Sequence, residues 1–195
     1  MRIIGGELKG KKLYTIPGTL IRPTADRLRE SIFNILSCLV KGTVVLDLFA
    51  GTGALGIEAL SRGAEFAVFI DNNKKALSVV ERNIQSCAVD NRFKIIRGNI
   101  VKNLNCIKSM GLKFDLVFMD PPYNKGFIEP TLINLHDSGS LGKDVCIIVE
   151  HTPFEPVLED CRQFELADQR KYGKTLISFI KPKLSDFLGR NVPRS

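Results

Sequence analysis

The hydrophobic positions along the chain follow two different spacings, which together predict an α/β fold. Between residues 24 and 39, apolar side chains recur at helical spacing, so this segment is expected to form a helix capped by Thr24. Its expected apolar stripe consists of Leu28, Ile32, Ile35, Leu36 and Leu39. From residue 43 onward, short apolar runs typical of buried parallel strands alternate with amphipathic segments. Strands are predicted at residues 43–48, 66–71, 93–97, 114–120 and 145–150, and helices at residues 54–62, 73–88, 100–110 and 127–136.

This alternation predicts a doubly wound, mainly parallel sheet with right-handed crossovers, in which ligands bind beyond the carboxyl ends of the strands. Two further strands, near residues 162–171 and 174–181, are separated by a connection short enough for an antiparallel hairpin. The first residues read as two short strands around a glycine-rich turn. The expected parts are an N-terminal β-hairpin extension at residues 1–23, one α/β domain at residues 24–182 and a basic tail at residues 183–195.

Composition limits the class of protein. A chain of 195 residues suits one α/β domain. No apolar run approaches the ~18 residues that span a bilayer, and the N terminus lacks signal-peptide anatomy, so we expect a cytoplasmic protein without a membrane partner. The five cysteines form no CxxC pair and the two histidines are isolated, so no metal site is expected.

The positive charge of the chain is concentrated at its two ends. The net charge is +7; residues 1–30 carry seven Lys or Arg against three acids, and residues 170–195 carry seven against one. A polyanionic partner contacted by both ends would explain this distribution, although basic termini can also serve solubility alone. The predicted RNA-binding residues are Arg2, Lys9, Lys11, Lys12, Arg22, Arg27, Lys171 and Lys174.

A glycine-rich turn follows Asp47, at the end of the first core strand, and Gly51, Gly53 and Gly56 satisfy the GxGxxG pattern. This pattern fits a dinucleotide as well as S-adenosylmethionine. Asp47 favours the second ligand, because a pyrophosphate prefers bare backbone N–H groups at a helix N terminus. A carboxylate instead attracts the ammonium and sulfonium charges of S-adenosylmethionine, which we therefore predict as the cofactor.

Polar residues after the next two strands complete the predicted cofactor site. Asp71 stands twenty residues after Gly51, where a carboxylate binds the hydroxyls of a ribose. Asn99 follows the third strand and is placed to contact the adenine edge. The predicted cofactor-binding residues are Asp47, Phe49, Ala50, Gly51, Thr52, Gly53, Asp71, Asn72, Asn99, Ile100 and Asp120.

The DPPY motif, Asp120-Pro121-Pro122-Tyr123, follows the fourth predicted strand, and its four residues are the predicted catalytic residues. Its prolines fix φ and remove two N–H donors, which leaves a rigid backbone rich in acceptors. An aromatic exocyclic amine is a poor nucleophile because its lone pair is delocalised. The Asp120 carboxylate and the Pro121 carbonyl can accept both N–H hydrogens and free that lone pair for in-line attack on a methyl carbon. Tyr123 offers a ring on which a base can stack. Guanine, adenine, cytosine and glutamine amines all fit this chemistry.

Segments along nearly the whole chain resemble those of one family. They are RIIGGELKGKKL at the start, RPTADRLRESIFNIL at 22–36, LDLFAGTGALGIEALSRGA at 46–64, FDLVFMDPPY at 114–123 and RKYGKTLISF at 170–179. Together they resemble the RsmD family of bacterial small-subunit rRNA guanine-N2 methyltransferases. The chain departs from the family pattern at Asn99, where Asp is common, and at Asp71, where Glu is common.

The resemblance implies the class I, Rossmann-like fold of methyltransferases that depend on S-adenosylmethionine. It also implies methylation of the N2 amine of one guanine, guanine 966, in 16S rRNA, with a partly assembled 30S subunit as substrate. A monomer is expected. The family assigns no role to the basic tail at residues 183–195.

Three other functions remain open from the residues alone. A DNA adenine or cytosine amino methyltransferase shares the DPPY chemistry but usually carries a separate recognition domain, for which this chain has little room. A protein glutamine methyltransferase would need little positive charge. A non-catalytic RNA-binding module could keep the fold, but the presence of Asp47, Asp71 and Asp120 argues against it.

Overall fold

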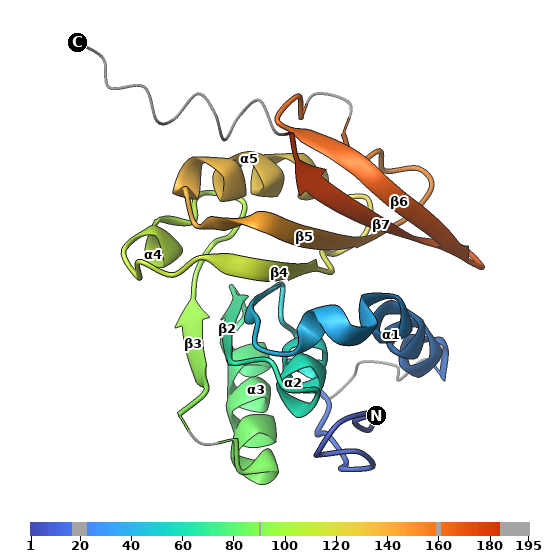
Figure 1. The fold of residues 1–195 in the computed structure, drawn as a ribbon, viewed down its shortest axis with the longest axis vertical. Coiled ribbons are helices and arrows are strands. Elements are labelled where there is room, and N and C mark those ends of the chain that lie inside the picture. The colour runs from blue at the N-terminus through green and yellow to red at the C-terminus, as the bar shows by residue number, and fades with distance from the viewer. Residues whose placement is uncertain (17–22, 90, 159–160, 184–195) are drawn as a thin grey trace.

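The protein folds around a mixed sheet of seven strands in the order β3-β2-β1-β4-β5-β7-β6 (Figure 1). The computed structural model describes residues 1–16, 23–89, 91–158 and 161–183. The strands are β1 (Val44–Leu48), β2 (Phe66–Asp71), β3 (Phe93–Arg97), β4 (Phe114–Met119), β5 (Leu141–His151), β6 (Phe164–Tyr172) and β7 (Thr175–Pro182). Strands β1 to β5 pair in parallel, and β7 pairs antiparallel with β5 and β6. The predicted doubly wound sheet with a C-terminal hairpin is confirmed.

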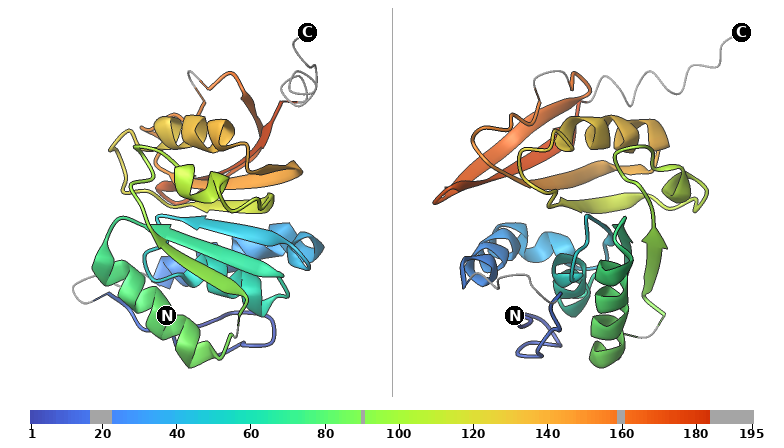
Figure 2. Two further views of the ribbon diagram at one scale, coloured as in Figure 1. Left: turned by 90° about the vertical axis from the view of Figure 1, so that its left-hand side faces the viewer. Right: turned by 180° about the vertical axis from the view of Figure 1, so that it is seen from behind.

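Helices cover both faces of this sheet (Figure 2). They are α1 (Pro23–Leu36), η1 (Ser37–Val40), α2 (Ala54–Ser61), α3 (Lys74–Cys87), α4 (Asn105–Lys108) and α5 (Ile128–Ser138). Because side chains alternate along each strand, neighbouring residues face opposite layers. Val45 belongs to a core cluster that includes residues of α1, α2 and α3, whereas Leu46 belongs to a second cluster that includes residues of α4 and α5. The site-bearing ends of the strands are therefore held in a closely packed core.

Helix α1 differs from its prediction in position and in rotation. It begins at Pro23, which suits a first helical position, so Thr24 lies inside the first turn rather than at the cap. The predicted apolar stripe is wrong in part, because Ile35 and Leu39 are exposed by 40% and 60% and Phe33 is buried instead. The helix is rotated so that Arg29, only 4% exposed, can reach the acidic residue Glu58 on α2.

Two other elements are shorter than predicted. The expected helix at residues 100–110 is reduced to the single turn of α4. The N-terminal segment does turn back on itself, but one isolated antiparallel bridge, between Arg2 and Lys12, replaces the predicted pair of strands. The arm keeps some backbone hydrogen bonds of its own, such as the one from the Ile3 N–H to the Lys11 carbonyl at 2.9 Å. The N–H groups of Ile4 and Gly5 donate instead to a side chain of α2, so the ladder between two strands is interrupted.

Glu58 holds this N-terminal arm, which we define as residues 1–16. Its fully buried carboxylate accepts hydrogen bonds from the N–H groups of Ile4 and Gly5, each at 2.8 Å. Gly6 has φ +76°, and a Cβ there would clash with the carbonyl of Ser61. The arm is therefore fastened to the C-terminal half of α2.

Arg22 and all but the first residue of the predicted tail at 183–195 lie outside the described residues. The two-residue connection between β6 and β7 places Gly173 at φ +62°, as a tight hairpin turn requires.

Candidate active site

The glycine-rich turn after β1 is held by two carboxylates from neighbouring strands. Asp47 Oδ2 accepts a hydrogen bond from the Gly56 N–H at 2.9 Å, within the first turn of α2. Asp71, at the end of β2, accepts from the Gly51 N–H at 2.9 Å. Gly53 has φ +75° and lies close to Phe69 and Val80, where a side chain would need space. The backbone therefore passes close to both carboxylates.

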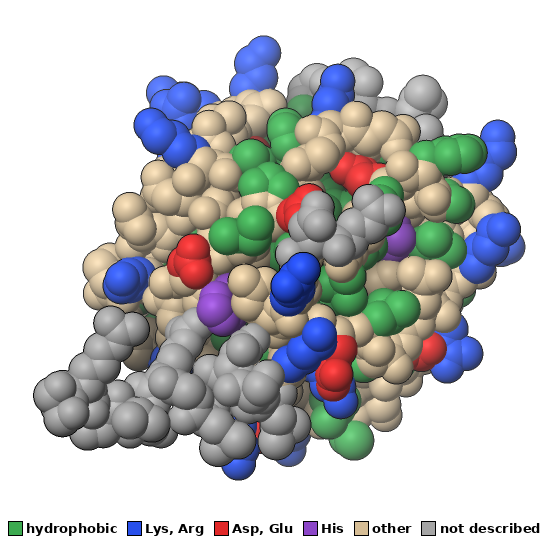
Figure 3. Space-filling view, turned by 90° about the horizontal axis from the view of Figure 1, so that it is seen from above, with side chains coloured by type: hydrophobic (Ala, Val, Ile, Leu, Met, Phe, Trp, Pro, Cys, Tyr) green, Lys and Arg blue, Asp and Glu red, His purple; other side chains and the backbone are tan. Residues whose placement is uncertain are grey.

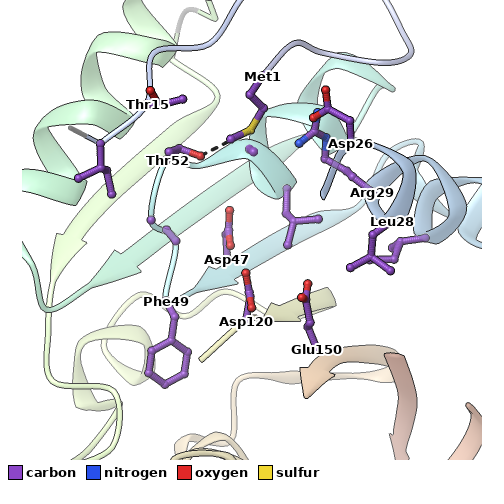
Figure 4. Close-up of a pocket in the computed structure, with 16 residues that line it drawn as sticks. Met1, Thr15, Asp26, Leu28, Arg29, Asp47, Phe49, Thr52, Asp120 and Glu150 are labelled. Carbon is purple, nitrogen blue, oxygen red and sulfur yellow. Dashed lines mark hydrogen bonds and ion pairs between the residues drawn. The ribbon is translucent and has the colours of Figure 1, made fainter. Parts of the chain in front are cut away.

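Two cavities lie beside this turn, and Phe49 lines both of them. The first, of about 300 Å³, brings together the cofactor turn, α1, the N-terminal arm and the ends of β4 and β5 (Figure 4). The second, of about 500 Å³, lies at the ends of β2 and β3. Both fall within the range of small-molecule sites, roughly 300–1,000 Å³.

The predicted residues divide between these cavities. The first is lined by Asp47, Phe49, Ala50, Gly51, Thr52 and Asp120. The second is lined by Phe49, Asp71, Asn72, Asn99, Ile100 and Pro122. The predicted residues Gly53, Pro121 and Tyr123 line neither cavity; Gly53 ends the turn and the other two belong to the DPPY motif. One elongated ligand could thus run from the Asp47 side, past Phe49, to Asn99.

The first cavity contains a cluster of carboxylates. Asp47, Asp120 and Glu150 point toward one another in it (Figure 4). Burial raises the pKa of Asp47 to about 7; the Gly56 hydrogen bond opposes this shift and the charge of Asp71 adds to it. The Asp120 side chain is exposed to the cavity, while protein surrounds it on its other sides. Burial by this protein has the largest effect on the pKa of Asp120, followed by the charges of Glu150 and Asp47, and together they raise it well above the usual range. Such a cluster favours a cationic ligand, which would lower these pKa values.

Strand β5 and the turn after it hold the DPPY motif in place. The Tyr123 hydroxyl donates to Glu150 Oε1. The carboxylate of Glu155, only 8% exposed, accepts from the N–H groups of Asn124 at 2.8 Å and Gly126 at 2.9 Å. Burial and then the hydrogen bond to Glu150 raise the pKa of Tyr123, so its hydroxyl stays protonated and remains a donor.

The turn that carries Glu155 also presents an aromatic ring. The Glu155 N–H donates to the Thr152 carbonyl at 3.1 Å, and Thr152 Oγ1 donates to Asn124 Oδ1 at 2.8 Å. Between them, Phe154 is 89% exposed. A large apolar side chain held out in solvent beside the DPPY loop is available for contact with a partner.

The N-terminal arm forms part of the wall of the first cavity. Met1, Thr15 and Ile16 line it, together with residues of α1. Asn83, fully buried on α3, accepts from the Tyr14 N–H at 2.6 Å and donates to the Thr52 carbonyl at 2.9 Å. The arm, expected only as an RNA contact, is thus bonded to the cofactor turn.

Sequence reasoning missed several residues of this site, namely Asp26, Leu28, Arg29, Ile32, Asn83, Phe127, Glu150 and Glu155. The one available signal was that Glu150 ends the predicted strand at residues 145–150; in the structure this strand lies next to the one that leads to Asp120. No local pattern marks the others.

The predicted RNA contacts are mostly on the surface. Arg2, Lys9, Lys12, Arg27, Lys171 and Lys174 are exposed, and Lys11 is half-buried. The β6–β7 turn projects at the same end of the molecule as α1 (Figures 1 and 2). On the face seen in Figure 3, Lys and Arg side chains lie mainly around the rim rather than in one patch.

Among the described residues, no group of three or more His, Cys, Asp or Glu side chains could hold a metal ion. None of the described helices is long and apolar enough to cross a membrane.

The strand order and the cavities at the carboxyl ends of the strands define a class I methyltransferase fold. The family model described as "Conserved hypothetical protein 95" matches residues 1–181. Ribosomal RNA small subunit methyltransferase D of Escherichia coli is 36% identical over 77% of this chain and 74% of its own length. YlbH of Bacillus subtilis, provisionally named an rRNA methyltransferase, is 33% identical over 94% of this chain and 100% of its own length.

A solved structure agrees with these similarities. The Escherichia coli protein yhhF superposes with a TM-score of 0.80 and is 32% identical, covering 94% of this chain and 98% of that one. The chain belongs to the RsmD family.

Proposed function

We propose that this protein methylates the N2 amine of a guanine in small-subunit ribosomal RNA, with S-adenosylmethionine as the methyl donor. The observation that carries the proposal is the position of Asp120. Its carboxylate lines the same cavity as Asp47 and the cofactor turn, so an amine acceptor and a cation site meet in one place. Similarity to ribosomal RNA small subunit methyltransferase D supports 16S rRNA as the substrate, and we propose guanine 966 as the nucleotide.

The residues present fit this cofactor. The carboxylates of Asp47, Asp120 and Glu150 suit an ammonium and a sulfonium group. Asp71 opens on the second cavity, where it would accept hydrogen bonds from ribose hydroxyls, and Asn99 and Ile100 line the part that would hold the adenine. When bound, S-adenosylmethionine supplies an electrophilic methyl carbon.

The chain itself supplies positioning and proton acceptors. The Asp120 carboxylate and the Pro121 carbonyl accept the two N2 hydrogens, which aligns the nitrogen lone pair with the methyl carbon. Positioning of this kind can contribute about 7–11 kcal/mol. A cation in the cavity lowers the pKa of Asp120, so its carboxylate is in the accepting form when the site is loaded. After transfer, one N2 proton leaves to Asp120 Oδ or to water.

The exposed basic residues and Phe154 support a polynucleotide as the partner. Lysine and arginine side chains contact phosphates, and an exposed aromatic ring provides a stacking surface for a base. We further propose that the substrate is a partly assembled 30S subunit in the cytoplasm and that the enzyme acts as a monomer.

Transfer of label from S-adenosylmethionine tests the function. Purified protein is incubated with unmodified 30S subunits, with 16S rRNA and with duplex DNA, and the product is mapped by mass spectrometry. We expect N2-methylguanosine at one position of 16S rRNA. Label on DNA alone, or on a base other than guanine, would overturn the proposal.

A further inference from the structure

The ends of β4 and β5 place two carboxylates side by side. The parallel register pairs Met119 with Val149, so the next residues, Asp120 and Glu150, follow on neighbouring strands. Neighbouring strands are about 4.8 Å apart. Both side chains point into the first cavity (Figure 4). Next to the acceptor expected to hold the amine, the protein therefore places a second acceptor.

Glu150 is held in a defined orientation. The Tyr123 hydroxyl donates to its Oε1, and its backbone pairs with Ile177 of β7 inside the sheet. Tyr123 is also the ring on which the target base is expected to stack. One residue thus fixes both the plane of the base and the carboxylate at its edge.

The possible targets differ in what lies next to their amine. In guanine, the N2 amine is adjacent to N1–H, which is a donor. In adenine and cytosine, the corresponding neighbour is a ring nitrogen lone pair, and in a glutamine side chain it is a carbonyl oxygen. An acceptor that faces another acceptor loses its hydrogen bond and remains desolvated. Of these four targets, a second fixed carboxylate suits guanine alone.

We propose that Glu150 selects guanine by accepting a hydrogen bond from N1–H while Asp120 accepts from N2–H. This inference rests on the proposed function and explains how the DPPY motif, which fits four kinds of amine, acts on one. A site built to pair with a substrate donor discriminates strongly against analogues that lack it, by about 10⁴-fold in favourable cases.

The test compares two target bases in the same RNA. We would reconstitute 30S subunits with 16S rRNA that carries either guanine or 2-aminopurine at the methylated position. The analogue keeps the amine but has a lone pair at N1. The wild-type protein should prefer guanine by about 10²-fold or more in kcat/KM.

Glu150→Gln should reduce this preference at least about tenfold, because its amide can present an N–H to the N1 lone pair. Tyr123→Phe, which keeps the ring and removes the hydroxyl, should reduce it less. Glu81→Gln makes the same chemical change on the exposed side of α3 and should leave the preference unchanged. Calorimetry with S-adenosylhomocysteine checks that each variant keeps its cofactor site.

The outcomes are distinct. If Glu150→Gln slows both substrates equally and keeps the preference, Glu150 only positions Tyr123 and the inference is wrong. If the wild-type protein methylates a base other than guanine, the proposed function itself is wrong. A preference that falls in Glu150→Gln but not in Glu81→Gln supports the inference.

Discussion

Glu155 accepts a hydrogen bond from the Asn124 N–H at 2.8 Å, and this bond joins the turn after β5 to the loop that carries the DPPY motif. The same carboxylate binds the Gly126 N–H. The conformation of the loop therefore depends on a residue more than thirty positions away from Asp120.

Removal of Glu155 should loosen the reaction centre. In Glu155→Ala the two N–H groups turn to water, because Asn124 and Gly126 are exposed, so the loss of stability should be modest, about 1–3 kcal/mol. We expect kcat to fall at least about tenfold, since small displacements of positioning groups are costly. Steady-state kinetics and thermal melts measure both effects. Unchanged kcat would mean that the loop keeps its shape without this anchor.

Asp120→Ala should remove methyl transfer and largely keep cofactor binding. Loss of a single preorganised electrostatic group commonly costs about 10²–10³-fold in kcat. S-adenosylhomocysteine calorimetry serves as the control for the cofactor site. Turnover near the wild-type value would contradict the role of Asp120 as amine acceptor.

Cofactor affinity should rise with pH. The pKa of Asp47 in the empty site is about 7, and its ionised form is the one that attracts a cation. Binding therefore releases protons, and the affinity should increase by about tenfold in total between pH 6 and 8 and level off above that range. Calorimetry in buffers of different ionisation enthalpy would detect the released protons. In Asp47→Asn, the affinity should be weaker and its dependence on pH shallower; an equally steep dependence would assign the proton to another group.

The same pKa shift predicts how the stability of the cofactor-free protein depends on pH. Because the folded pKa of Asp47 lies above the unfolded value of 3.8, the folded state binds the proton more tightly. The contribution of Asp47 to stability is therefore largest at low pH and is lost as the pH rises through about 7. Relative to the wild type, Asp47→Asn should gain stability from pH 6 to pH 8 in thermal melts. A constant difference would show that Asp47 ionises normally.

Asn83→Ala should weaken the connection between the N-terminal arm and the cofactor turn. It leaves the Tyr14 N–H and the Thr52 carbonyl without their partner. We expect a stability loss of about 1–3 kcal/mol and weaker binding of S-adenosylhomocysteine. Ser78→Ala, on the exposed side of the same helix, is the matched control. Unchanged affinity would limit Asn83 to a purely stabilising role.

Much of the site could be predicted from local pattern. Asp47, Asp71 and Asp120 each stand at or just after the end of an apolar run, and parallel strands bring such ends to one edge of a sheet. The periodicity of 2 or 3.6 residues that defines the elements is a property of adjacent residues. It therefore located nearly every strand and most of the helices before any tertiary contact was known.

Contacts between segments far apart in the sequence determine the parts of the site that local patterns do not predict. Glu58 binds Ile4, Asn83 binds Tyr14 and Glu155 binds Asn124, across 54, 69 and 31 positions of sequence respectively. Side chains of this kind carry no periodic signal, because their role depends on which backbone N–H groups the fold brings near them. For the same reason, α1 is oriented so that Arg29 is buried and Ile35 is exposed. The sequence by itself thus determined the type of chemistry. The wall of the cofactor cavity and the position of Glu150 beside Asp120 were decided only by the tertiary structure, because burial and desolvation, not local spacing, determine those contacts.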